Sequence, residues 1–101
     1  MIKHIVFWRL KDSARGKSKH DNSRELKAVL EGLKNKIGTI KKIEVGINFN
    51  KSEAAYDVAL YSEFDSPEDL ETYQKHPEHV KVVGFVNEIR DDRAVVDYEI
   101  R

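Results

Sequence analysis

The first residues of the chain predict a β-strand with two apolar faces. Along residues 2–10, Ile5 and Phe7 fall on one face, and the other face carries Ile2, His4, Val6, Trp8 and Leu10. The strand period of two separates these faces. Because both contain large hydrophobic side chains, both are expected to be covered.

Three further strands are predicted from hydrophobic patterning. Hydrophobic and polar residues alternate over 43–49, and the polar loop 50–53 connects this segment to a strand at 56–64, so the two predict a hairpin. A charged turn is expected at 90–93, and the segment 93–100 predicts the last strand.

Two regions carry helical signals. Residues 18–37 predict an amphipathic helix that ends at Gly38, because apolar side chains recur there at helical spacing, namely Leu26, Val29, Leu30, Leu33 and Ile37. A second helix is expected to begin at Pro67, with Ser66 as its N-cap. Pro77 interrupts it, because the residue before a proline avoids the helical conformation. The helix restarts with an inner stripe of Val82, Val83, Val86 and Ile89.

The resulting element order, β-α-β-β-α-α-β, predicts an α+β fold, a ferredoxin-like antiparallel sheet with helices on one face. With 101 residues, the chain is expected to be a single domain, residues 1–101. Helices on one face leave Ile5 and Phe7 uncovered on the other, and exposing such side chains is costly. Packing against the sheet of a second copy is the simplest solution, so we expect a homodimer.

Composition narrows the classes of function. The chain has no cysteine, which excludes disulfides, thiolate metal sites and a cysteine nucleophile. No segment has the pattern of a signal peptide or a membrane span, so we expect a cytoplasmic protein with no membrane partner. Residues 1–50 carry 12 basic and 5 acidic groups, but Asp21, Glu25 and Glu31 interrupt the basic ones, and the net charge is zero. This favours a solvated helix face, and no nucleic-acid partner is expected.

His4 is the first candidate functional residue. It shares a strand face with Val6 and Trp8 and therefore points into an apolar layer. Buried polar groups are normally hydrogen-bonded, so a core histidine and a histidine that faces a ligand are both compatible with this position.

A second group of candidates surrounds the predicted helix break at Pro77. Tyr73, His76 and His79 lie there, and a break over the sheet opens a gap in which a hydroxyl and an imidazole could meet a small molecule. The alternative is that His76 caps a helix, Tyr73 packs in the core and His79 begins the next helix. The two histidines lack a third ligand for zinc, so no metal and no cofactor is expected.

The sequence also resembles a known family along essentially its whole length. The matching segments are MIKHIVFWRLKD at residues 1–12, YDVA at 56–59, FDS at 64–66 and, above all, YQKHPEHV at 73–80. They resemble the stress-responsive α/β barrel domain family, called Dabb. The resemblance implies a ferredoxin-like protomer whose sheet pairs with that of a second copy to form a dimeric α+β barrel.

The family includes plant stress proteins and a plant polyketide cyclase, olivetolic acid cyclase, which the chain resembles distantly. The resemblance implies that His79, Tyr73 and His4 occupy its catalytic positions. The ligand-binding positions expected beside them are Val6, Trp8, Val58, Leu26 and His76. Where the cyclase has a further pocket histidine this chain has Val58, so the particular cyclase substrate does not transfer. In some members, main-chain carbonyls at the end of the first helix bind a cation, here at about residues 34–40.

Two functions are compatible with these observations. The first is a homodimer with a small apolar pocket between sheet and helices, which binds or transforms a small aromatic or polyketide-like compound with Tyr73 and His79 as acid and base. The second is a non-catalytic stress-response or assembly protein whose functional unit is the dimer.

Overall fold

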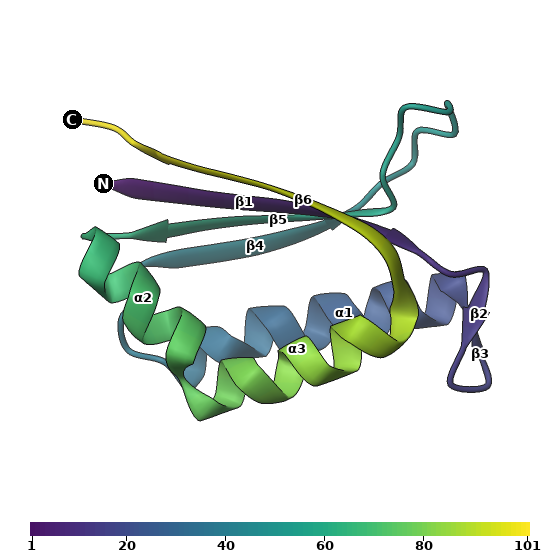
Figure 1. The fold of residues 1–101 in the computed structure, drawn as a ribbon, viewed down its shortest axis with the longest axis horizontal. Coiled ribbons are helices and arrows are strands. Elements are labelled where there is room, and N and C mark those ends of the chain that lie inside the picture. Colours follow the sequence, from purple (N-terminus) through teal and green to yellow (C-terminus); the bar gives the residue numbers. More distant parts are fainter.

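The computed structural model describes residues 1–101, which form one layer of sheet and one layer of helices (Figure 1). The antiparallel sheet has the strand order β4-β5-β1-β6, with β1 (Ile2–Leu10), β4 (Lys42–Ile47), β5 (Val58–Phe64) and β6 (Arg90–Glu99). The helical layer consists of α1 (Lys19–Gly32), α2 (Pro67–Lys75) and α3 (Pro77–Ile89). The predicted ferredoxin-like α+β fold is therefore confirmed.

The first helix is shorter than predicted. Ser18 is its N-cap and accepts a hydrogen bond from the backbone N–H of Asp21. The α-helix ends at Gly32, a residue of low helix propensity, and continues as the 3₁₀ turn η1 (Leu33–Asn35). The backbone N–H of Ile37 still donates to the carbonyl of Leu33 at 2.9 Å, which keeps both apolar side chains in the core.

The predicted turn at 90–93 is wrong, because β6 begins immediately at Arg90. This residue is extended, with φ −92° and ψ 147°, and it pairs with Leu10 at the end of β1. The strands of the predicted hairpin are also shorter than expected, since Phe49 lies in the connecting loop and is 92 % exposed.

A short hairpin, β2 (Ser13–Ala14) and β3 (Lys17–Ser18), was not predicted. Its turn residues Arg15 and Gly16 both adopt positive φ, as the type I′ turn of a two-residue hairpin requires.

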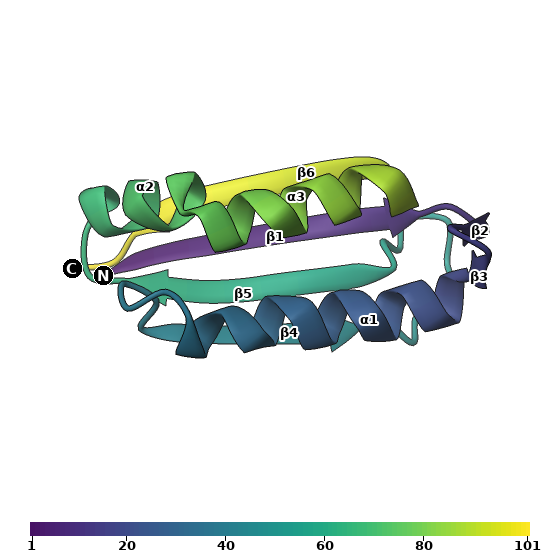
Figure 2. The same ribbon diagram turned by 90° about the horizontal axis from the view of Figure 1, so that it is seen from below.

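Strand register decides which side chains face the helices, all of which cover the same side of the sheet (Figure 2). Three rows of residues cross β5, β1 and β6 on this inner face: Ser62-His4-Asp97, Leu60-Val6-Val95 and Val58-Trp8-Arg93. The middle strand is buried on this face, whereas β6 is an edge strand whose side chains remain largely exposed. The inner face therefore combines an apolar centre with a polar margin.

The outer face of the sheet carries no helix (Figure 1). Phe7 is 39 % exposed there, and Val96, which pairs with Ile5 in the register, is 52 % exposed. The predicted uncovered apolar face thus exists in the isolated chain.

None of the helices combines the length and the hydrophobicity that a membrane span requires.

Candidate functional site

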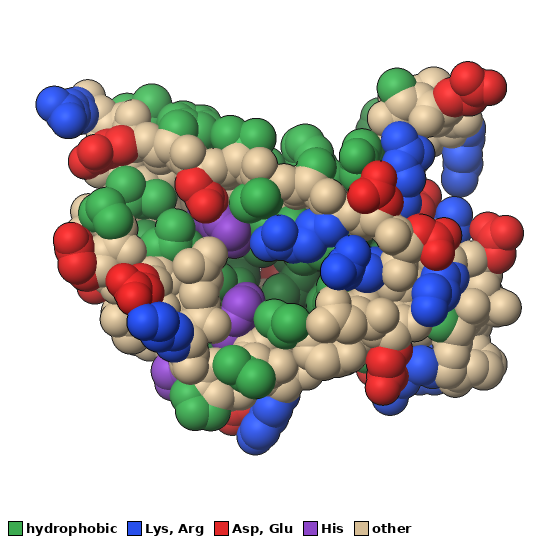
Figure 3. Space-filling view, in the orientation of Figure 1, with side chains coloured by type: hydrophobic (Ala, Val, Ile, Leu, Met, Phe, Trp, Pro, Cys, Tyr) green, Lys and Arg blue, Asp and Glu red, His purple; other side chains and the backbone are tan.

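A cavity of about 250 Å³ lies between the inner face of the sheet and the helices. The sheet contributes six lining residues, which are His4, Val6, Trp8, Leu60, Arg90 and Arg93, and most of the others belong to α3. Figure 3 shows the mouth of this hollow, with histidine on one side and basic side chains at its rim. Its wall is mainly apolar, as in pockets that bind small organic molecules.

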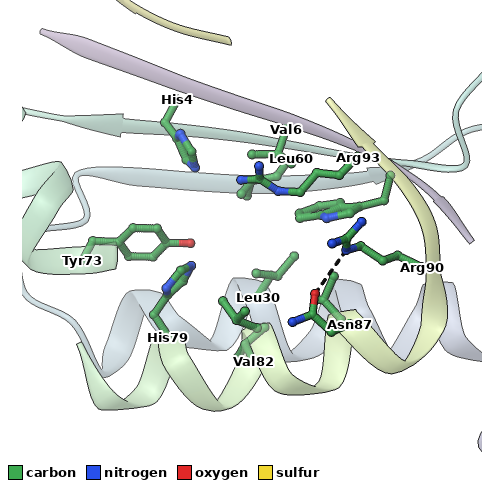
Figure 4. A pocket seen from close by; sticks show the side chains of 13 residues that line it. His4, Val6, Leu30, Leu60, Tyr73, His79, Val82, Asn87, Arg90 and Arg93 are labelled. Atoms are coloured by element: carbon green, nitrogen blue, oxygen red, sulfur yellow. Dashed lines mark hydrogen bonds between the residues drawn. The ribbon is translucent and has the colours of Figure 1, made fainter. Parts of the chain in front are cut away.

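Three residues singled out from the sequence come together at one end of the cavity (Figure 4). His4 comes from β1, Tyr73 from α2 and His79 from α3. The Tyr73 ring centroid lies 4.4 Å from that of His79 and 6.2 Å from that of His4. Of the expected ligand-binding residues, Val6 and Trp8 also line the cavity.

The other three expected positions lie outside this lining. Val58 and Leu26 are buried in the hydrophobic core, because the strand and helix register directs them to the packing between α1 and the sheet. His76 is the C-cap of α2 and the N-cap of α3, and its Nδ1 accepts a hydrogen bond of 3.1 Å from the backbone N–H of Glu78. Its side chain therefore holds the helix break that positions Tyr73 and His79.

His79 has the environment of a neutral base. Its Nδ1–H donates a hydrogen bond of 3.0 Å to the carbonyl of Gln74, which leaves Nε2 without the proton. Burial lowers the pKa of His79 below its ordinary value, against the opposing effect of the Gln74 carbonyl, and electrostatic interactions with His4 and Arg93 lower it further. The imidazole points into the cavity (Figure 4).

Tyr73 has the environment of a permanent proton donor. Its side chain is fully buried, and its hydroxyl has no hydrogen-bond partner within the protein. Burial raises the pKa of this hydroxyl well above its ordinary range. A buried hydroxyl without a partner is costly by about 1–3 kcal/mol, so this O–H is available to a molecule in the cavity.

Asp97 is a site residue that the sequence analysis missed. It lies beside His4 in the register of β1 and β6, and its carboxylate accepts a hydrogen bond from Nδ1 of His4. This contact orients the imidazole and leaves Nε2 on the cavity side. Alternation along β6 could have placed Asp97 on the same face as Arg93, but the pairing with His4 depends on a register between strands about ninety residues apart.

The opposite end of the cavity is basic and was also missed. Arg90 and Asn87 line it, with the guanidinium of Arg93 between them and His4, and Nε–H of Arg90 donates to Oδ1 of Asn87 at 3.1 Å (Figure 4). Both arginines fall within the segment that the sequence predicted to be a turn. The structure contains no group of three or more His, Cys, Asp or Glu side chains arranged to hold a metal ion.

Two solved structures with similar folds extend this picture. A dimeric protein of unknown function with a ferredoxin-like fold from Bacteroides fragilis is 42 % identical, with a TM-score of 0.87 over 98 % of this chain and 95 % of that chain. A hydroxynitrile lyase from Passiflora edulis has a TM-score of 0.82 over 99 % of this chain and 93 % of that chain, and at 20 % identity it shares the fold alone.

Comparisons of sequence agree with those of structure. A stress-response A/B barrel domain-containing protein of Arabidopsis thaliana is 32 % identical over 103 residues, which cover 97 % of this chain and 36 % of that protein. The chain spans between about a third and a half of the length of the curated relatives that it matches. The model of the family described as Stress responsive A/B Barrel Domain matches residues 2–100. The chain therefore belongs to the stress-responsive A/B barrel domain (Dabb) family.

Proposed function

We propose that the protein binds a small aromatic or polyketide-like compound in the cavity and that Tyr73 and His79 act on it as acid and base. The observation that carries this proposal is the pairing of a buried, unpartnered hydroxyl with a neutral imidazole at one end of an apolar cavity. Titratable groups with perturbed pKa values in a pocket are characteristic of functional sites.

The chemistry that suits this pair is the enolisation of a carbonyl compound. Nε2 of His79 accepts a proton from the carbon next to the carbonyl, and the electrons of that C–H bond move into a new C=C bond. The hydroxyl of Tyr73 donates a hydrogen bond to the carbonyl oxygen, where negative charge develops. His4, oriented by Asp97, presents its Nε2 to the same end of the cavity. Proton transfer of this kind needs no co-reactant.

We also propose that the outer face of the sheet pairs with a second copy, so that the functional unit is a dimer. The exposed apolar side chains of Phe7 and Val96 support this, and so does the description of the Bacteroides fragilis neighbour as dimeric. The alternative, non-catalytic stress-response or assembly function would use the same outer face for association and would not require the cavity.

Histidine NMR separates the two functions, because the chain contains its own internal control. Small aromatic ketones, such as acetophenone and its hydroxylated derivatives, are titrated into the protein while the imidazole C–H resonances are followed. We expect the resonances of His4 and His79 to shift, and that of the exposed His20 to remain unchanged. Binding should weaken in His79→Ala and persist in the control His20→Ala. If His4 and His79 stay unperturbed by every compound up to its solubility limit, the pocket function is wrong and the assembly function stands.

A further inference from the structure

The end of the cavity away from Tyr73 is built to hold an anion. Resting on the ligand-binding function proposed above, we infer that the natural ligand is a small aromatic carboxylic acid, whose carboxylate binds Arg93 and Arg90 while its apolar body extends toward Tyr73 and His79. This assigns a substrate class and an anchoring site to the cavity.

The two guanidinium groups are free of acidic partners. No carboxylate oxygen lies within 4.0 Å of the guanidinium nitrogens of Arg90 or Arg93, whereas the guanidinium groups of Arg9 and Arg15 are both paired with acidic side chains. The sequence places Asp92 next to Arg93, but strand alternation turns Asp92 to the outer face, where it approaches Arg9 at 4.0 Å. Unpaired arginines that line a cavity have their hydrogen-bond donors available to a ligand.

The remaining polar groups of the cavity are also mostly donors. The indole N–H of Trp8 is buried without a hydrogen-bond partner, and the hydroxyl of Tyr73 is in the same situation. No Asp or Glu lines the cavity. Asp97 is the neighbouring acid on the inner face of β6, and its carboxylate is engaged by His4. A wall with two positive charges and no negative one favours a negatively charged ligand.

The arrangement along the cavity sets the orientation of that ligand. Figure 4 shows Arg90 and Asn87 at the end opposite Tyr73, with the guanidinium of Arg93 reaching between them and His4. Apolar side chains separate the two ends, among them Val6, Leu30 and Val82. A ligand anchored by its acid group at the arginines therefore presents its other end to the acid-base pair.

The size of the cavity favours one ring and a carboxylate over a larger anion. Apolar cavities of about 150 Å³ hold benzene, so 250 Å³ has room for a single ring with a short substituent. Arginine also matches a planar carboxylate with two parallel hydrogen bonds. Because Arg93 is exposed and Arg90 half-buried, the anion remains near the mouth, where its desolvation is less costly.

Pairs of acid and amide with the same shape test this inference directly. Benzoate is compared with benzamide, and phenylacetate with phenylacetamide, by isothermal titration calorimetry at low salt. We expect each acid to bind at least about tenfold more tightly than its amide, as charge-assisted hydrogen bonds predict. Raising the salt concentration should weaken the binding of the acids and leave the binding of the amides unchanged.

Arginine variants locate the effect. Arg93→Gln and Arg90→Gln should each weaken acid binding by about tenfold and leave amide binding within twofold of the wild type. Arg24→Gln is the matched control, because Arg24 is exposed on α1, has no ion pair and does not line the cavity. Circular dichroism and the histidine NMR spectrum confirm that each variant retains the fold.

The outcomes separate this inference from the function on which it rests. If acids and amides bind equally, if the arginine variants match Arg24→Gln, or if neutral ketones bind and acids do not, the carboxylate site is wrong while the pocket function stands. If none of the acids, amides or ketones binds or shifts His4 and His79, both the pocket function and the carboxylate site are wrong.

Discussion

Burial acts on His79 and Tyr73 in opposite directions, although their ring centroids are only 4.4 Å apart. It lowers the pKa of the imidazole and raises that of the hydroxyl, because in both cases it disfavours the charged form. At neutral pH the histidine therefore lacks its second proton and the tyrosine retains its own. Two neutral groups of this kind can serve as base and acid without a further change of protonation.

The pKa of His79 makes stability depend on pH. Unfolding returns the imidazole to an ordinary pKa of 6.5, so the unfolded chain binds this proton at a higher pH than the folded one. The contribution of neutral His79 is therefore complete above pH 6.5 and is lost as the pH falls through the lower folded pKa. We expect the difference in unfolding free energy between the wild type and His79→Gln to shrink as the pH is lowered from about 8 to about 5. Urea denaturation measures it, with the exposed His20→Gln as control; a difference that grows on acidification would contradict this assignment.

Asp97 should matter through its contact with His4. The substitution Asp97→Asn keeps the shape of the side chain but removes its charge. Because the hydrogen bond from His4 to this carboxylate is charge-assisted and the carboxylate is partly exposed, we expect the free energy of unfolding to fall by about 1 kcal/mol. Asp92→Asn is the control from the outer face of the same strand, and we expect it to change the free energy of unfolding by less than about 0.5 kcal/mol. Urea denaturation gives both values, and ¹⁵N NMR of His4 reports the tautomer. Equal effects of the two substitutions would show that Asp97 does not orient His4.

Among the elements, the junction of α2 and α3 has the most direct bearing on the site. His76 ends one helix and caps the next, and the turn at Pro77 brings Tyr73 and His79 to the same end of the cavity. The two helices contact β1, β5 and α1, so the geometry of the junction is transmitted to the cavity wall. His76 thus acts through its cap and not through contact with a ligand.

This cap can be tested with a conservative substitution. Asparagine is a good N-cap residue, so the free energy of unfolding of His76→Asn should stay within about 0.5 kcal/mol of the wild-type value. That of His76→Ala should be lower by about 1 kcal/mol. Ligand affinity in His76→Asn should remain within twofold of the wild type, since the side chain does not line the cavity. Thermal denaturation and calorimetric titration measure the two effects. A strong loss of affinity in His76→Asn would instead make His76 a ligand contact.

The whole molecule has two apolar surfaces and covers only one of them. The helices bury the inner face, while Phe7, Val96 and Tyr98 of the outer face are each between 39 % and 52 % exposed. A domain of this size has little further surface to bury on its own. Association through the outer face therefore removes apolar area from water that the chain cannot cover by itself.

Dimerisation is predicted at this scale. Light scattering should give twice the mass of one chain at micromolar concentration, and Phe7→Glu should give monomers or insoluble protein, because it places a charge in the buried interface. Val80→Glu is the matched control, since Val80 is 56 % exposed on α3, away from the outer face, and this variant should remain dimeric. A monomeric wild type would exclude pairing through the sheet.

Sequence alone determined the features that depend on neighbours along the chain. Alternation in β1 put His4, Val6 and Trp8 on one face, and the Ser66 cap and the proline at Pro77 set the helix starts, because helix-start signals and strand periodicity are local. The same local reasoning explains the error at 90–93, where charged residues resemble a turn.

Only the tertiary structure decided which distant residues meet. Pairing of β6 with β1 put Asp97 beside His4 and turned Arg93 toward the cavity, while helix packing withdrew Leu26 and Val58 into the core. Register between strands is set by the sum of many cross-strand and core contacts, and no single residue specifies it. The end of the cavity that carries Tyr73 and His79 was therefore predictable from a short segment of sequence, whereas its basic end depends on the pairing of the edge strand β6.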